Sequence, residues 1–139
     1  MKKIKIEDLM ENGHRLMNQV VIDTVSVLKE AYFVIKIDDL LKERNLTQKD
    51  LAQMTGMRVG TISDLVNGKG ISLNKLQLFA IMAALRVTSL NDIYEVELPE
   101  ELENAFNTER MEWTSEKEMP INIKDMYKSH VLKTTGLTE

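Results

Sequence analysis

The spacing of apolar positions predicts helices along most of the chain. Residues 7–36 carry apolar side chains at three- and four-residue steps, as an amphipathic helix does. Residues 20–27 and 31–37 are also rich in β-branched and aromatic side chains, so a short hairpin is the alternative for this segment. Residues 37–45 predict a further short helix. Residues 73–87 are apolar almost all round, so we expect both faces of that helix to be buried.

Residues 47–68 predict two short helices joined by a tight turn. Thr47 is a good N-cap, and Asp50, three residues later, completes a capping box. Gly56 can adopt the positive φ that a chain reversal needs, and Gly68 ends the second helix in the same way. The apolar faces are formed by Leu51, Ala52 and Met54, and by Ile62, Leu65 and Val66. Two helices that cross steeply at such a turn make a helix-turn-helix unit, whose second helix is built to enter the major groove of DNA.

Capping and proline signals mark the later boundaries. Ser89 and Asp92 have the spacing of a second capping box, which predicts a short fifth helix through Tyr94. After Pro99, the acidic residues 100–118 hold apolar side chains in loose helical spacing. These side chains are Leu102, Phe106, Met111 and Trp113. We expect a solvated helix that packs Leu102, Phe106 and Trp113 onto the domain; the alternatives are a dimer arm, a docking site for another protein, or a competitor with DNA.

Several elements of this central stretch match one known pattern. They are Thr47-Gln48, Leu51-Ala52, Gly56, Thr61-Ile62-Ser63 and Asn67-Gly68-Lys69. Together they resemble the XRE family, the phage-repressor and Cro type of helix-turn-helix protein, over about residues 37–96. The resemblance implies an all-α fold: a lambda-repressor-like five-helix domain with helical extensions. Residues 1–36 would form the N-terminal extension and residues 97–139 an acidic, partly helical tail.

The resemblance also implies which residues contact DNA. Base edges would be contacted by Val59, Gly60, Ser63 and Asp64, with Arg58 and Thr61 beside them, and phosphates by Gln48, Asn67 and Lys69. Arg58 is the strongest candidate for a bidentate contact to guanine, with a phosphate as the alternative. Val59 offers only apolar contact, for example to a thymine methyl group. Gly60 either lets the backbone approach the groove or serves helix packing, and Asp64 either accepts from cytosine or contacts nothing.

The charge distribution modifies this picture. The chain carries a formal net charge of −4, which is unusual for a DNA-binding protein. Residues 97–139 account for it, because they hold ten acidic and five basic side chains, whereas residues 38–96 hold seven of each. The DNA-binding face can therefore be locally positive, although only modestly so. We expect weak non-specific binding that is strongly sensitive to salt.

The remaining chemistry excludes several classes of protein. There is no cysteine, His14 and His130 are isolated, and no nucleophile–base pair, metal cluster or phosphate loop is present, so we expect neither an enzyme nor a cofactor. No membrane span or signal peptide is expected, which favours the cytoplasm. The leading hypothesis is a sequence-specific transcriptional regulator, more often a repressor on family grounds, that binds an inverted repeat of double-stranded DNA as a homodimer. The alternative is a protein-interaction module (an antirepressor, antitoxin or adaptor) that contacts a protein partner, for example through the acidic tail.

Overall fold

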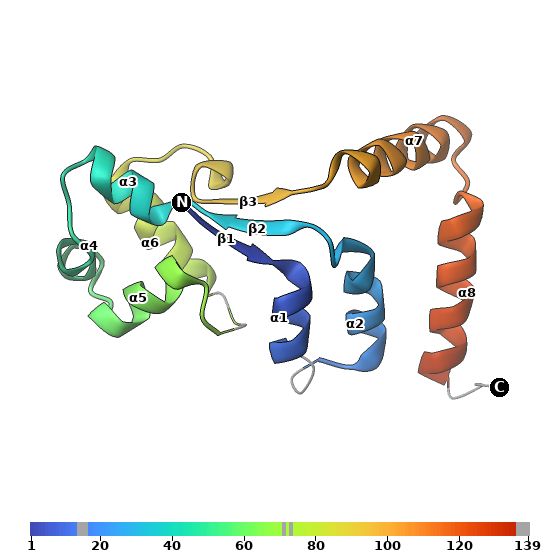
Figure 1. Ribbon diagram of the computed structural model, residues 1–139, viewed down its shortest axis with the longest axis horizontal. Helices are drawn as coiled ribbons and strands as arrows, with labels where there is room; N and C mark the ends of the chain where they lie inside the picture. The colour runs from blue at the N-terminus through green and yellow to red at the C-terminus, as the bar shows by residue number, and fades with distance from the viewer. Residues whose placement is uncertain (14–16, 71, 73, 136–139) are drawn as a thin grey trace.

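The structure is a computed structural model, and it describes residues 1–13, 17–70, 72 and 74–135. His14 lies outside the described residues. In chain order the elements are β1 (Lys2–Lys5), α1 (Ile6–Gly13), α2 (Gln19–Val25), the 3₁₀ turn η1 (Ser26–Leu28), β2 (Tyr32–Ile35), α3 (Ile37–Glu43), α4 (Gln48–Thr55), α5 (Val59–Asn67), α6 (Lys75–Leu85), the 3₁₀ turn η2 (Leu90–Asp92), β3 (Tyr94–Glu97), α7 (Glu100–Glu116) and α8 (Ile121–Thr135). Figure 1 shows α3–α6 gathered in one lobe, with the strands leading from it toward α7 and α8.

A small antiparallel sheet corrects the all-α expectation. Its order is β1-β2-β3, with Lys2 opposite Ile35 in one pair and Ile35 opposite Tyr94 in the other. The leading segment is neither one long helix nor the alternative hairpin. Residues 19–25 are helical, whereas Tyr32–Ile35 is a strand. The β-branched and aromatic side chains of β2 do favour a strand, but its partners are more than 25 residues away in either direction along the chain.

The predicted fifth helix is also replaced. Leu90–Asp92 form only a 3₁₀ turn, in which the Ser89 hydroxyl accepts a hydrogen bond from Asn91 N at 3.2 Å. The chain then continues as β3, because Lys36 N donates to Ile93 O at 2.8 Å and the Tyr94 ring stacks on Phe33 with centroids 5.1 Å apart. Pairing with β2 therefore ends the helical turn.

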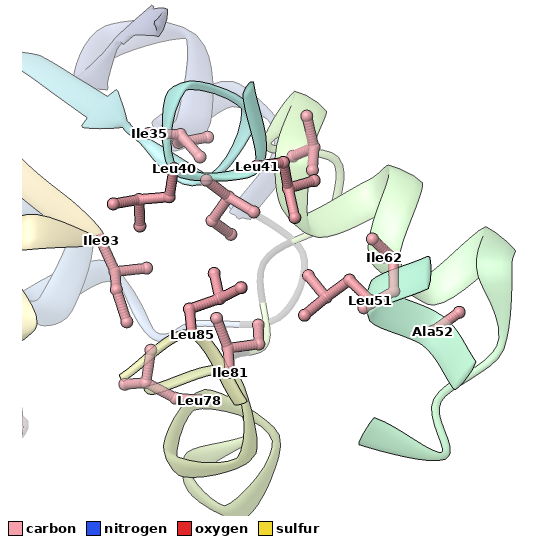
Figure 2. Packing of buried hydrophobic residues seen from close by; sticks show 12 residues of the cluster. Ile35, Leu40, Leu41, Leu51, Ala52, Ile62, Leu78, Ile81, Leu85 and Ile93 are labelled. Atoms are coloured by element: carbon pink, nitrogen blue, oxygen red, sulfur yellow. The ribbon is translucent and has the colours of Figure 1, made fainter. Parts of the chain in front are cut away.

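The hydrophobic core lies between α3, α4, α5 and α6 and is completed by Ile35 at the end of β2 and by Ile93 just before β3 (Figure 2). Its members are Ile35, Ile37, Leu40, Leu41, Leu51, Ala52, Ile62, Val66, Leu78, Ile81, Leu85 and Ile93. Burying an aliphatic side chain of this size contributes about 1.5–3 kcal/mol. Ile35 and Ile93, which flank the helical stretch, therefore attach the sheet firmly to the four helices.

Helix α6 has an exposed apolar side, contrary to the expectation that both of its faces are buried. Leu78, Ile81 and Leu85 face the core, but Leu76 is 77% exposed and Phe79 is 51% exposed. That side of α6 is therefore open to solvent.

The last two helices form an arm, residues 100–135, that extends away from the α3–α6 lobe (Figure 1). Neither α7 nor α8 contributes a buried side chain to the structure. The expected packing of the tail onto the domain is therefore wrong. At its far end the arm is linked to α2, because Lys133 Nζ lies 2.6 Å from Asp23 Oδ2. That hydrogen bond, helped by one from Gln19, lowers the pKa of the Asp23 carboxyl.

Candidate nucleic-acid interface

The α4–α5 pair has the geometry that the sequence predicts. The Thr47 hydroxyl accepts from Asp50 N at 3.1 Å, and an Asp50 carboxylate oxygen accepts from Thr47 N at 2.9 Å, so the capping box is complete. The hydrogen bond from the Thr47 backbone, followed by one with the Thr47 side chain, lowers the pKa of the Asp50 carboxyl. Gly56 ends α4 with φ +78°, and the chain reverses into α5, which begins at Val59. This turn sets the position of α5 relative to α4.

Helix α5 buries one side and offers the other to solvent. Ile62 and Val66 are buried in the core, whereas Val59 is 49% exposed and Gly60 is exposed beside it. Figure 1 shows α4 and α5 at the part of the lobe that lies away from α7 and α8. The acidic arm therefore does not cover the exposed side of α5. The hypothesis that the arm competes with DNA gains no support.

The predicted contact residues differ in how free they are. Six of them are exposed, namely Arg58, Val59, Gly60, Asp64, Asn67 and Lys69. The other three are half-buried, namely Gln48, Thr61 and Ser63. Arg58 precedes α5 and makes no side-chain capping bond there. In contrast, the Asn67 side chain donates to Ser63 O at 2.9 Å and to the Ser63 hydroxyl at 3.4 Å. A phosphate contact by Asn67 therefore has to use its remaining hydrogen-bonding capacity or replace these bonds.

The C-terminal end of α5 faces a cleft that no pattern in the sequence predicts. The cleft has a volume of about 410 Å³, and its other walls come from α1, α2 and the Phe33–Tyr94 stack. Asp64 and Lys69 line it. The part of α5 that is exposed and lies outside this cleft is therefore its N-terminal half, around Arg58, Val59 and Gly60. The apolar character of four lining residues, Leu9, Met10, Val21 and Val25, is visible in the sequence. Periodicity alone does not show which element these side chains face.

The cations of this face are available for phosphate. Among the ion pairs of the described residues, Lys36, Lys42 and Arg44 are engaged with acids, but Arg58 and Lys69 are not. Lys49 is similarly unpaired within the described chain; it is exposed in the first turn of α4, next to Gln48. No motif in the sequence marks Lys49. Its position beside a capped helix N-terminus makes it a further candidate phosphate contact.

Comparison with known families agrees with this geometry. Residues 36–99 match the family described as the Cro/C1-type HTH DNA-binding domain. This stretch is therefore similar to a Cro/C1-type helix-turn-helix DNA-binding domain. The resemblance to the XRE family is thereby confirmed, and the matched stretch contains the elements from α3 to β3. No curated protein and no solved structure matches the chain.

Two further observations concern the rest of the molecule. In the described ranges, no helix combines the length and the apolar character needed to cross a membrane. Across the same residues, no group of three or more His, Cys, Asp or Glu side chains is arranged to hold a metal ion.

Proposed function

We propose that this chain is a sequence-specific transcriptional regulator, a repressor, that binds double-stranded DNA through α5. The observation that carries the proposal is the exposed first turn of α5, where Arg58, Val59 and Gly60 face solvent next to the capped N-terminus of α4. In a helix-turn-helix domain, side chains at the start of the second helix meet base edges in the major groove.

Each residue of this face has a proposed role. Arg58 donates bidentately to a guanine, Val59 contacts a thymine methyl group, and Gly60 lets the backbone approach the groove. Gln48, Lys49 and the first amides of α4 hold one phosphate and fix the register of the domain on the duplex. The remaining proposed contacts are Thr61, Ser63, Asp64, Asn67 and Lys69.

The proposed binding form is a homodimer on an inverted repeat. Two recognition helices about 34 Å apart would enter successive major grooves on one side of the duplex. The partly exposed aromatic side chains of α7, such as Trp113, support the presence of a second copy, because association would cover them.

The test is selection of bound sites from a random DNA library, followed by a mobility-shift assay on the recovered site. We expect a palindrome. Arg58→Ala should lower the affinity for that site by about tenfold to a hundredfold, since a bidentate contact discriminates by about 1–3 kcal/mol. Arg110→Ala, which removes an exposed arginine from α7, is the charge-matched control and should leave the affinity within about twofold.

A second variant separates base recognition from phosphate binding. Arg58→Lys keeps the positive charge but loses the planar fork that guanine recognition requires. If Arg58 contacts guanine, Arg58→Lys should behave like Arg58→Ala; if it contacts a phosphate, the lysine variant should bind nearly as well as the wild type. Absence of any shift at low salt would contradict the regulator and favour a protein-interaction role for the domain.

A further inference from the structure

Both helices of the arm present apolar side chains that the described chain leaves partly exposed. On α7, Leu102, Phe106 and Trp113 follow one another at helical spacing, and the two aromatic rings are 37% and 39% exposed. On α8, the outer side holds Ile121, Tyr127, Val131 and Leu132, all of them exposed. Helices of 17 and 15 residues gain most of their stability from packing such a face, so an arm without a partner is incomplete.

The charges of the two helices are opposite. Helix α7 holds six glutamates and one arginine, and none of these glutamates belongs to an ion pair among the described residues. Helix α8 holds three lysines and one aspartate. Lys124 and Lys128 are spaced so that they lie on the same side of α8 as Ile121 and Val131. Helix α8 therefore joins apolar and basic side chains on one face.

The acidic and apolar residues of α7 are also on one side. At 100° per residue, Glu109 and Glu116 border the stripe formed by Phe106 and Trp113. The stripe of α7 and the outer face of α8 are thus both apolar, and the charges that border them are opposite in sign. Within one chain they cannot pair, because α7 and α8 meet at a corner instead of lying side by side (Figure 1).

We propose that the occupant of each face is a second copy of this chain, with α7 of one copy packed against α8 of the other and the reverse contact made at the same time. Pairing α7 with α7 would place two strongly acidic helices together, which costs energy. Helices about 25 and 22 Å long, each offering a face about 10 Å wide, bury on the order of 1,000 Å² over the two contacts. That is the area which a specific interface needs.

This arrangement rests on the dimer of the proposed function and names the surface that forms it. The arm lies away from α4 and α5, so pairing through it leaves both recognition helices free (Figure 1). The interface can be tested in the absence of DNA. A failure of the proposed dimer interface is therefore distinguishable from a failure of DNA binding.

The experiment measures the mass of the full chain by sedimentation between about 0.5 and 50 µM, together with the fluorescence of Trp113. Trp113 is the one tryptophan in the chain, so its emission reports only on the arm. We expect dimers at the upper concentrations and a blue shift of the emission as the ring becomes buried. A chain that stays monomeric at 50 µM, with unchanged emission, would overturn the proposal.

Variants locate the interface. Phe106→Glu should abolish the dimer and the blue shift, and it should leave the unfolding of the core unchanged, since Phe106 is not a core residue. The matched control is Phe79→Glu on α6, which makes the same substitution at a phenylalanine of another surface that is 51% exposed, against 37% for Phe106. It should leave the dimer intact. The opposite outcome, in which only Phe79→Glu gives monomers, would place the dimer at α6 and overturn the proposal.

Charge exchange tests the α7–α8 pairing itself. Glu109→Lys and Lys128→Glu should each weaken dimerisation by about threefold to tenfold, because each places like charges across the interface. The double variant should recover most of the loss if the two side chains face each other between copies. Equal losses that simply multiply in the double variant would overturn the pairing of α7 with α8.

Discussion

At the scale of single residues, Gly68 has two constraints at once. It ends α5 with φ +70°, a conformation that side chains with a Cβ rarely adopt. A Cβ there would overlap Ile4 Cδ1 of β1 and lie 2.9 Å from Ile35 Cδ1 of β2. The close approach of the sheet to the end of the recognition helix therefore depends on the absence of a side chain.

Gly68→Ala should reduce the free energy of unfolding by about 1–3 kcal/mol, from backbone strain and from displacement of Ile4. Gly70→Ala is the matched control, because Gly70 also has a positive φ, +80°, but has nothing within 4 Å of the added atom. Gly70→Ala should reduce the free energy of unfolding only through backbone strain, by about 1 kcal/mol. Urea unfolding of both variants measures the difference. Equal losses would mean that the contact with Ile4 does not matter.

Gly60 is the contrasting case, since it lies within α5 and open space surrounds its would-be Cβ. Gly60→Ala should increase the free energy of unfolding by about 0.5–1 kcal/mol through helix propensity. It should also weaken binding to the selected DNA site, because we propose that the backbone approaches the groove there. Unfolding in urea and a mobility-shift assay give the two values. A variant that is more stable and binds equally well would leave Gly60 without a role at the DNA.

At the scale of elements, the capping box of α4 should make part of the stability pH-dependent. The pKa of Asp50 is lowered from 3.8 by hydrogen bonds from Thr47, so this contribution is fully present above pH 3.8. It is lost as the pH falls below 3.8 through the lowered value. Asp50→Asn should therefore be less stable than the wild type at pH 7, and the difference should narrow near pH 3. Parallel unfolding curves at the two pH values test this, and a difference that stays constant would contradict it.

At the scale of the whole molecule, the stretch that matches the family is not the complete folding unit. Residues 36–99 contain β3 but neither of the other strands, and they lack the core residue Ile35. Helices α7 and α8, in contrast, add no buried side chain. The cooperative unit is therefore expected to be residues 1–99, with the arm serving association.

Truncation tests this division. Removing residues 1–35 should lower the midpoint of thermal unfolding strongly or prevent folding, because β3 then loses its partner strand and the core loses Ile35. Removing residues 100–139 should change the midpoint by only a few degrees when the proteins are compared at low micromolar concentration, where dimerisation contributes little. A large loss on removing the arm alone would show that it stabilises the monomer.

The sequence by itself determined the features that are set by neighbours along the chain. The caps at Thr47 and Gly56 and the short amphipathic repeats fix α3, α4 and α5, and the resemblance places Arg58, Val59 and Gly60 at the start of α5. Each of these signals involves residues within about four positions of one another. The helix-turn-helix domain and the order of its proposed contact residues were therefore accessible without coordinates.

Only the tertiary structure decided the features that join distant parts of the chain. The sheet brings residues 2–5, 32–35 and 94–97 together, and each strand of four residues is too short to show a distinctive pattern alone. The same holds for the exposed side of α6, the Asn67–Ser63 hydrogen bonds and the cleft beside Lys69. Whether an apolar or polar side chain is covered depends on which remote element packs on it, and local periodicity carries no information about that partner.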